Sequence, residues 1–266
     1  MPNSPYEPKK SLGQNFMLSD ELTSLMVYSL DLDTEDLVVE IGAGLGAVTQ
    51  KLSEQLFDPS SRIYAVEVDE RFIPKLEEMF RTTLNVVVIT ADILTWLPQQ
   101  SFDREFKVLG SLPFNITSPI LHMLVKLPQK PKKSVLLVQK EVAENLVSLA
   151  PNAFYLSSFV QTFYDVLYVR TVPKDVFIPV PKVEGAIVLL DRKAKIQDFF
   201  KDPQLINEYE KFLHRGFSHP QKMLNKVFSK QELAITGING NLRPHDLDVS
   251  VWLDMFEKLT LNPKIL

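Results

Sequence analysis

The stretch Leu37-Val-Val-Glu-Ile-Gly-Ala-Gly-Leu-Gly46 decides the fold, because a largely apolar run passes directly into a glycine-rich turn. Such a run is typical of a strand that is covered on both faces. Glycines allow a tight turn and let a ligand approach the backbone, and a following helix offers unpaired N–H groups. The pattern therefore predicts a strand–turn–helix unit with a ligand site at the turn, the alternative being a tight turn without a ligand.

Similar β-branched runs and helical patterns alternate along most of the chain. We expect strands at 37–41, 63–68, 86–90, 106–109, 134–139, 163–172 and 186–190. We expect helices between them at 48–56, 70–80, 118–127 and about 140–149. Strands and helices that alternate in this way form a parallel sheet wound by helices. The predicted fold class is therefore α/β, with a Rossmann-like sheet.

The chain changes character after the polar stretch 191–198, which is typical of a linker. Beyond this stretch the sequence predicts helices without intervening strands. We therefore expect two domains, a larger one over residues 1–194 that holds the ligand site and a small all-α domain over residues 195–266.

Composition narrows the class of protein. The 266 residues include no cysteine, which excludes a disulfide scaffold, cysteine-bound zinc, iron–sulfur clusters and thiol catalysis. Hydrophobic residues make up 45% and charged residues 23%, as in ordinary soluble globular proteins. No apolar run is long enough to cross a membrane, and the first residues lack the apolar core of a signal peptide. We expect a cytoplasmic protein without a membrane partner.

Basic residues gather in two places, although 29 basic and 33 acidic side chains leave a net charge of −4. Residues 211–230 contain no acid, and a second cluster lies at 126–133. A surface that binds a polyanion is one interpretation, and a solvated helix face is the other. In the first case the residues expected to contact the polyanion, an RNA backbone being one example, are Arg215, Lys222, Lys226 and Lys230, the three lysines sharing one helical face.

Acidic side chains follow two further predicted strands. Glu67 ends the second strand, where a carboxylate can accept hydrogen bonds from both ribose hydroxyls of NAD or of S-adenosylmethionine. Asp92 ends the third strand, where it could accept from an adenine amine or simply cap a helix. Because the carboxyl ends of parallel strands meet at one edge of a sheet, these acids and the glycine turn predict a ligand crevice.

The fourth strand runs into Ser111-Leu-Pro-Phe114. Pro113 restricts its own backbone and biases Leu112 toward an extended conformation, which aims the Leu112 carbonyl outward. This carbonyl and the Ser111 hydroxyl could accept the two hydrogens of a nucleobase amine, and Phe114 could stack on the base. The alternative is a proline-terminated strand followed by a core phenylalanine.

With these motifs the chain resembles the ribosomal RNA adenine N6-dimethyltransferases. The resemblance extends from Lys10 to about Leu259 and includes the glycine turn, Glu67, Asp92 and the Ser111 motif. Four other segments match the family: Lys10-Ser-Leu-Gly-Gln-Asn-Phe-Met17, Gln139-Lys-Glu-Val142, Phe177-Ile-Pro-Val-Pro-Lys-Val183 and Gly216-Phe-Ser-His-Pro-Gln-Lys222.

The resemblance implies an S-adenosylmethionine-dependent enzyme that methylates two adjacent adenines near the 3′ end of small-subunit ribosomal RNA. The expected partner is ribosomal RNA or a ribosomal subunit precursor, and a monomer without a metal is expected. Ser111, Leu112, Pro113, Phe114 and Phe177 would be catalytic, with the adenine held between a partly exposed Phe177 and Phe114. The alternative for Phe177 is packing in the core. The cofactor would contact Asn15, Met17, Gly42, Gly44, Glu67, Asp92 and Ser111.

Three departures from the family pattern concern the target. Ser111 replaces the usual asparagine and offers a weaker, rotatable acceptor. The run Tyr155-Leu-Ser-Ser-Phe159 lacks the family's arginine, and His219-Pro-Gln221 replaces most of a basic run. The last two changes remove potential phosphate contacts, which would alter RNA affinity or the choice of target.

Other functions fit parts of the same sequence. A non-catalytic RNA-binding assembly or transcription factor would explain Ser111 and the thinned basic run, but not an intact cofactor set. A large-subunit RNA methylase would use the same motifs. An NAD-dependent oxidoreductase would explain the glycine turn and Glu67, but not the Ser111 motif. The four histidines match no catalytic pattern.

Overall fold

The computed structural model describes residues 8–9, 12–194 and 199–260. Its internal contacts divide the chain into two compact units. The first, here called the sheet unit, comprises Met1–Ala143 and Leu167–Arg192. The second, the helical unit, comprises Glu144–Val166 and Lys193–Leu266.

A seven-stranded sheet forms the centre of the sheet unit, in the order β4-β3-β2-β5-β6-β9-β7. Neighbours from β4 to β6 are parallel, and β9 runs antiparallel to β6. The order reverses between β2 and β5, the point at which α/β sheets open a crevice for ligands. The predicted strands and fold class are confirmed by β2 Leu37–Ile41, β3 Arg62–Glu67, β4 Val86–Thr90, β5 Phe106–Ser111, β6 Lys133–Gln139, β7 Tyr164–Val172 and β9 Gly185–Arg192.

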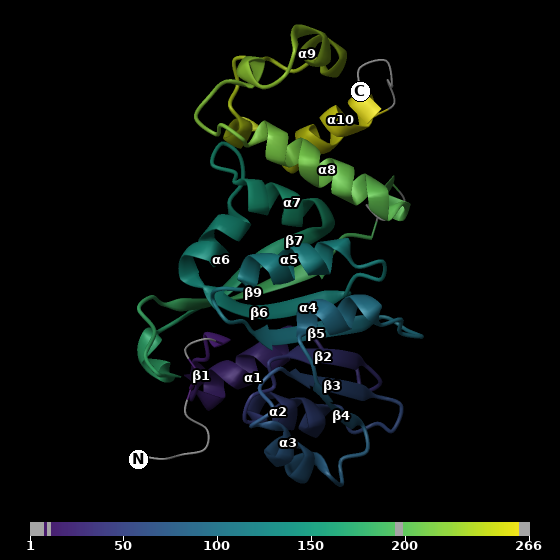
Figure 1. The fold of residues 1–266 in the computed structure, drawn as a ribbon, viewed down its shortest axis with the longest axis vertical. Coiled ribbons are helices and arrows are strands. Elements are labelled where there is room, and N and C mark those ends of the chain that lie inside the picture. The colour runs from purple at the N-terminus through teal and green to yellow at the C-terminus, as the bar shows by residue number, and fades with distance from the viewer. Residues whose placement is uncertain (1–7, 10–11, 195–198, 261–266) are drawn as a thin grey trace. The chain divides into compact units, whose positions relative to one another are not determined.

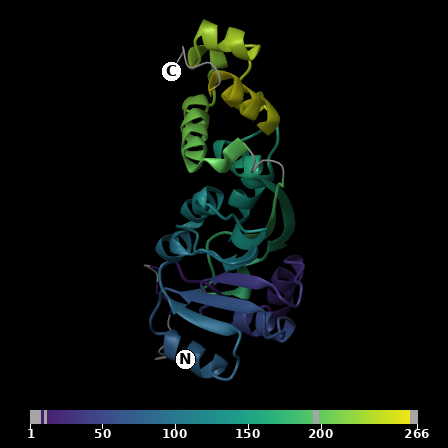
Figure 2. The ribbon, with the colours of Figure 1, turned by 90° about the vertical axis from the view of Figure 1, so that its right-hand side faces the viewer.

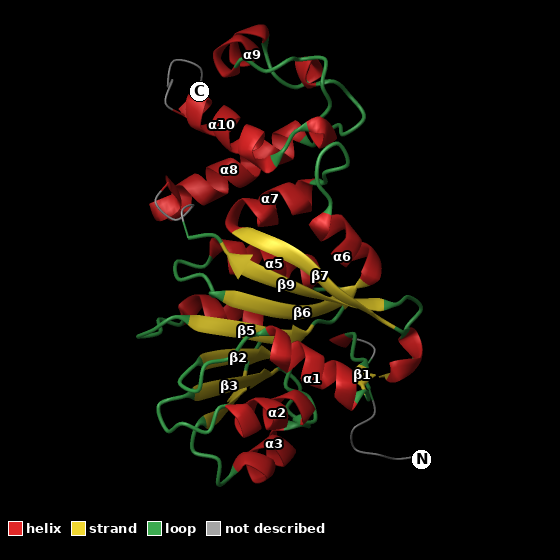
Figure 3. Ribbon diagram, turned by 180° about the vertical axis from the view of Figure 1, so that it is seen from behind, coloured by secondary structure: helices red, strands yellow, loops and turns green. Residues whose placement is uncertain are grey.

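Helices cover both faces of this sheet. Buried side chains of α1 and α2 pack with alternate strand residues such as Val38 and Ile63 into one hydrophobic cluster. Figures 2 and 3 show α1 on the face of the sheet opposite to α5. The helices are α1 Asp20–Ser29, α2 Ala47–Gln55, α3 Ile73–Phe80, α4 Ile93–Trp96, α5 Thr117–Lys126 and α6 Lys140–Val147, with short 3₁₀ turns η2 Leu97–Gln99 and η3 Lys174–Val176.

A two-stranded sheet joins segments that are far apart in the sequence. Strand β1, Phe16–Met17, pairs antiparallel with β8, Phe177–Ile178, so that Met17 lies opposite Phe177. The Leu18 amide extends the pairing by donating to the Val176 carbonyl at 2.8 Å. The N-terminal segment is thereby fixed beside the loop that follows β7 (Figure 1).

The helical unit is organised around aromatic side chains. Trp252, Tyr209 and Phe159 are fully buried. A Cβ on Gly216 would lie 2.5 Å from the Trp252 ring, so only glycine permits this approach. Its described elements are α7 Tyr155–Phe163, α8 Pro203–Gly216, α9 Lys230–Thr236 and α10 Val249–Thr260, with 3₁₀ turns η5 Phe199–Lys201, η6 Leu224–Lys226 and η7 Pro244–Asp246.

The observed division differs from the boundary that the sequence suggested. Residues 144–166 were expected in the larger domain, but they belong to the helical unit. The reason is α7, whose buried phenylalanines Phe159 and Phe163 join the aromatic core, with the Phe163 ring 4.8 Å from that of Phe200. The predicted linker overlaps the end of β9, and its residues 195–198 lie outside the described part of the chain.

No helix in the described ranges is both long enough and apolar enough to cross a membrane.

Candidate active site

A cavity of about 280 Å³ lies at the carboxyl edge of the parallel strands, where the strand order reverses. Small-molecule sites span roughly 300–1,000 Å³, so the volume is near the lower end of that range. The structure brings together here every residue that the sequence assigned to the cofactor or to catalysis: Asn15, Met17, Gly42, Gly44, Glu67, Asp92, Ser111, Leu112, Pro113, Phe114 and Phe177.

The glycine turn forms the floor of this cavity. Gly42 and Gly44 have φ of 75° and 54°, a region that other residues rarely adopt. The amides of Gly42 and Ala43 both donate to the Val66 carbonyl, which ties the turn to β3. Gly46 begins α2 in the left-handed conformation, and a Cβ there would lie 3.0 Å from Met79 Sδ.

Glu67 connects the glycine turn to the end of β3. Its side chain is 5% exposed; Oε2 accepts from the Gly44 amide and Oε1 from the Asp69 amide, each at 2.8 Å. Burial raises the pKa of this carboxyl, although the two amides act in the opposite direction. A carboxylate offers about four acceptor sites, so Glu67 keeps acceptor capacity for a ligand in the cavity.

Glu40 is a second buried carboxyl in the cavity wall, and the sequence analysis did not assign it to the site. It accepts a 2.5 Å hydrogen bond from the Thr49 hydroxyl of α2. Desolvation raises the pKa of Glu40 to about 7, and the nearby charge of Glu67 adds to this effect. An acid inside an otherwise apolar strand was the signal that could have revealed it.

Asp69 lies next to the cavity-lining residues Glu67 and Val68, and the sequence analysis assigned it no role of its own. It lies two positions after Glu67 and is 2% exposed. Its carboxylate accepts hydrogen bonds from Arg71, Gln14 and Lys9, of which the Arg71 bonds do most to lower the pKa of Asp69. Asp69 therefore binds the N-terminal segment to the edge of the sheet.

Asp92 combines the two roles that its position allowed. It caps α4, with Oδ1 accepting from the Leu94 amide at 2.9 Å, and it also lines the cavity. The helix cap accounts for its place in the sequence without a ligand. Because Asp92 also lines the cavity, it is still a candidate for a contact with adenine.

The Ser111–Phe114 loop follows β5 and is held in register with β6. The Leu112 amide donates to the Leu137 carbonyl at 2.9 Å, and the Pro113 carbonyl accepts from the Ile116 amide at 3.1 Å. Among the residues that the structure describes, neither the Leu112 carbonyl nor the Ser111 hydroxyl has an internal hydrogen-bond donor. Phe114 is half-buried at the cavity wall.

Phe177 differs from the partly exposed loop residue that was expected. It lies in strand β8, is 2% exposed and belongs to the hydrophobic cluster beneath α1. Strand β8 pairs with β1, with Met17 opposite Phe177, and strands this short have no recognisable pattern in the sequence. Phe177 still lines the cavity, but a base could stack on it only after a local rearrangement.

The part of the basic run that carries Lys222, Lys226 and Lys230 is not one helix. Helix α8 ends at Gly216 under the Trp252 ring, and Pro220 has no amide with which to continue it. Lys222 lies in a turn, Lys226 in η6 and Lys230 at the start of α9, all three exposed. The expected common helical face is therefore wrong, and the three lysines instead follow a folded loop.

Arg215 is engaged inside the helical unit, in contrast to its expected contact with RNA. Its guanidinium donates to both Glu232 oxygens at 2.6 and 2.9 Å and lies 4.6 Å from the centre of the Phe228 ring. The hydrogen bonds from Arg215 lower the pKa of Glu232 to about 2. This pair fixes the capping box of α9, which explains why an arginine stands there.

Other charged groups noted in the sequence have local partners. In the cluster at 126–133, Lys130 is 6% exposed and donates to the Leu127 carbonyl, while Lys133 pairs with Asp31 at 2.8 Å. The 126–133 cluster is therefore no open basic patch.

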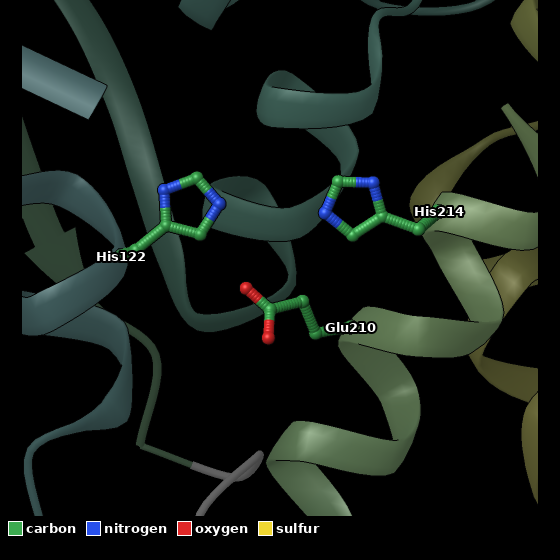
Figure 4. Close-up of side chains that lie close together, drawn as sticks. All are labelled: His122, Glu210 and His214. Carbon is green, nitrogen blue, oxygen red and sulfur yellow. The ribbon is translucent and has the colours of Figure 1, made fainter. Parts of the chain in front are cut away.

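Glu210 and His214 lie on successive turns of α8 (Figure 4), and the His214 ring stacks on Tyr155 with 4.0 Å between centroids.

Comparison with known proteins identifies the family of this chain. The profile of the family described as ribosomal RNA adenine dimethylase matches residues 6–261. The ribosomal RNA small subunit methyltransferase A of Sulfurihydrogenibium sp. (strain YO3AOP1) is 34% identical over 255 residues, covering 94% of this chain and 95% of that protein. The corresponding protein of Bacillus mycoides (strain KBAB4) is 34% identical over 278 residues, 96% of this chain and 92% of its own.

Solved structures support the fold. A dimethyladenosine transferase from Plasmodium falciparum superposes with a TM-score of 0.77 at 22% identity, covering 94% of this chain and 98% of that chain. The 23S rRNA methyltransferase ErmE superposes with a TM-score of 0.72 at 22% identity, covering 92% and 99%. The profile match over nearly the full length, together with the relatives above 30% identity, shows that the chain belongs to the ribosomal RNA adenine dimethylase family, whose methyl donor is S-adenosylmethionine.

Proposed function

We propose that this protein transfers methyl groups from S-adenosylmethionine to the N6 amines of two adjacent adenines near the 3′ end of small-subunit ribosomal RNA. The observation that carries the proposal is a single cavity that joins the glycine turn, Glu67 and Asp92 to the Ser111–Phe114 loop. The small-subunit target follows the names of the relatives that are 34% identical.

The residues of the cavity fit the cofactor. An ideal Cβ on Gly42 would meet nothing closer than the Ser111 carbonyl at 3.9 Å, so the space beside this glycine is open. Glu67 would hold the ribose hydroxyls and Asp92 the adenine amine, as charge-assisted acceptors. Asn15 and Met17 would contact the cofactor from the N-terminal segment, whose Lys10 and Ser11 lie outside the described residues.

The chain's own residues would activate and orient the target. S-adenosylmethionine supplies an electrophilic methyl group, so the protein mainly has to position a weakly nucleophilic amine. The Leu112 carbonyl and the Ser111 hydroxyl would accept the two N–H groups, which favours the pyramidal nitrogen of the transition state. Pro113 restricts this loop, and Phe114 offers a stacking face for the extruded adenine.

The helical unit would add affinity for the RNA backbone. Lys222, Lys226 and Lys230 are exposed and could each neutralise a phosphate, whereas Arg215 would act by holding α9 in place. We place the protein in the cytoplasm as a monomer that meets ribosomal RNA or a subunit precursor. We also propose, as the sequence predicted, that residues 195–266 bind the RNA.

Methylation of ribosomal subunits that lack the modification, mapped by primer extension, tests the proposal. The expected result is a stop at two adjacent adenines near the 3′ end of the small-subunit RNA, dependent on S-adenosylmethionine. Methylation of large-subunit RNA alone would contradict the target. Binding of NAD instead of S-adenosylmethionine would contradict the reaction.

A non-catalytic RNA-binding factor is the second candidate, and Ser111 is the observation that favours it. Serine is a weaker acceptor than the asparagine of the family pattern. If this candidate is correct, the protein binds ribosomal subunits but transfers no methyl group to them, whatever the cofactor concentration.

A further inference from the structure

The N-terminal segment of the sheet unit covers one side of the cavity. Residues 12–18, here called the strap, all contribute to the cavity wall. A Cβ on Gly13 would lie 2.8 Å from Asn115 Oδ1 and 3.3 Å from Pro113 Cβ, so the strap touches the loop proposed to hold the target. At its other end, Phe16 packs edge-on against Phe72 with 5.6 Å between ring centroids.

One carboxylate fixes this strap to the body of the sheet unit. Asp69 Oδ2 accepts from the Gln14 side-chain amide at 2.9 Å, and Oδ1 accepts from Lys9 Nζ at 3.3 Å. The Gln14 amide oxygen in turn accepts from the Lys9 backbone N–H at 2.8 Å. Arg71 donates to the same carboxylate, at 2.6 Å from Oδ2, and also to the Gln14 amide oxygen at 3.5 Å.

The position of Asp69 couples the strap to the cofactor acceptor. Its backbone amide donates to Glu67 Oε1, while its side chain, 1% exposed, holds Gln14. The turn that orients Glu67 therefore also orients the strap. A buried carboxylate with charge-assisted partners makes a strong and specific contact, because a lost partner leaves the charge uncompensated.

We propose that Asp69 is a positioning residue that holds the strap against the cavity through Gln14 and thereby sets the affinity for S-adenosylmethionine. The cofactor part of this inference rests on the proposed function, since Asn15 and Met17 are its expected strap contacts. The contact between Asp69 and the strap stands on the geometry alone.

Two variants separate the strap contact from general stability. Asp69→Asn removes the charge and keeps the shape, whereas Gln14→Ala removes the strap's side of the contact and leaves Asp69 paired with Arg71. The control is Asp31→Asn, which removes the charge of an exposed carboxylate that pairs with Lys133, at a position distant from the strap in the sequence. Asn is suited to position 31, where φ is 53°.

Hydrogen exchange and calorimetry give independent readouts. Both variants should speed exchange of the Leu18 amide, which donates to Val176, and weaken S-adenosylmethionine binding about tenfold, the loss expected for one charge-assisted hydrogen bond. KM for the cofactor should rise while kcat at saturating cofactor stays within about twofold, a split that transition-state interactions would not give. Asp31→Asn should change neither readout.

Unchanged exchange at Leu18 together with unchanged cofactor affinity in both variants would overturn the inference. An equal fall of kcat and rise of KM would also overturn it, because the effect would then not act through cofactor binding. If the two variants exchange faster at Leu18 but the wild-type protein binds no S-adenosylmethionine, the proposed function is overturned and the strap contact is not. The two failures are therefore distinguishable.

Discussion

The cavity of the sheet unit and the basic loop of the helical unit use charged side chains in opposite ways. Around the cavity of the sheet unit, Glu40, Glu67 and Asp69 are 2%, 5% and 2% exposed, and each is engaged by a hydroxyl, an amide or a cation. In the helical unit, Lys222 and Lys226 are exposed on a loop. The carboxylates around the cavity are held in a fixed geometry, whereas the lysines of the loop present their charge to solvent and are not held in one position.

This difference indicates what each unit can recognise. Buried charges interact strongly at short range and are little affected by salt, which suits a small ligand of defined shape. Exposed charges are screened over about 10 Å at 0.1 M salt and release counterions when they meet a polyanion. Salt and pH should therefore act on different units.

The largest expected effect concerns Glu40 and pH. Because its pKa rises from 4.5 to about 7 on folding, the folded chain binds an additional proton between these values. Stability should therefore fall as the pH rises through this window, with a cost of the order of 3 kcal/mol fully present above it. Glu40→Gln, which keeps an acceptor for Thr49, should remove this slope in urea unfolding.

Exposed Glu35 provides the control for this measurement, since Glu35→Gln changes the same net charge outside the cavity. A Glu40→Gln variant with the wild-type pH slope would show that burial does not perturb this carboxyl. The contrast between buried and exposed charge would then fail at Glu40.

The next effect concerns Glu67 and the cofactor. Glu67→Ala should weaken S-adenosylmethionine binding by roughly 1–3 kcal/mol, because a charge-assisted acceptor is lost. Calorimetry at low and high salt should give nearly the same loss, since the group is buried. Glu70→Ala, at an exposed position three residues later, should bind like wild type. An unchanged affinity would remove Glu67 from the site.

A smaller effect is expected in the helical unit. Neutralising Lys222, Lys226 and Lys230 together should reduce the salt dependence of RNA binding by roughly two to three counterions and leave cofactor affinity unchanged. Lys258→Gln is the control, because this lysine already pairs with Asp254 at 2.7 Å. An unaltered salt slope in the triple variant would favour the simple interpretation of a solvated surface.

Local patterns were sufficient to predict the sheet and the convergence of the site. The strands are continuous β-branched runs, and the carboxyl ends of parallel strands must meet, so Gly42, Glu67, Asp92 and Ser111 could be placed together from spacing. The spacing of residues in the sequence does not show which side chains form hydrogen bonds with each other. Asp69 and Gln14 lie far apart in the sequence, and nothing local indicates that they bond.

The remaining differences have the same origin in tertiary contacts. Phe177 is buried because two very short strands, β1 and β8, pair across most of the sheet unit's sequence. The basic run continues past the end of α8 at Gly216, where the Trp252 ring packs against the glycine. The expected i, i+4 face of the lysines failed because helical spacing in a sequence does not ensure a helix where proline and packing oppose it.

The smallest expected effect lies at Ser111, on the wall of the cavity and proposed to touch the substrate rather than the cofactor. Ser111→Ala removes one weak neutral acceptor and should lower the methylation rate by roughly 0.5–1.5 kcal/mol, about three- to twelvefold. Phe114→Ala should cost more, since it removes the stacking face for the base, worth roughly 1–3 kcal/mol. Ser111→Asn restores the family residue and should match or exceed wild type in single-turnover assays.

The expected order of methylation rates is Phe114→Ala lowest, then Ser111→Ala, then Ser111→Asn. A general loss of folding would not produce this order. Cofactor affinity should stay near wild type in Ser111→Asn, which separates the acceptor for the amine from the set that holds the cofactor. If wild type transfers no methyl group to any ribosomal substrate and Ser111→Asn does, the cavity has kept its cofactor geometry and lost its target acceptor. The buried carboxylates around Glu67 would then be retained although methyl transfer is lost, and RNA binding through the exposed lysines would remain as the function.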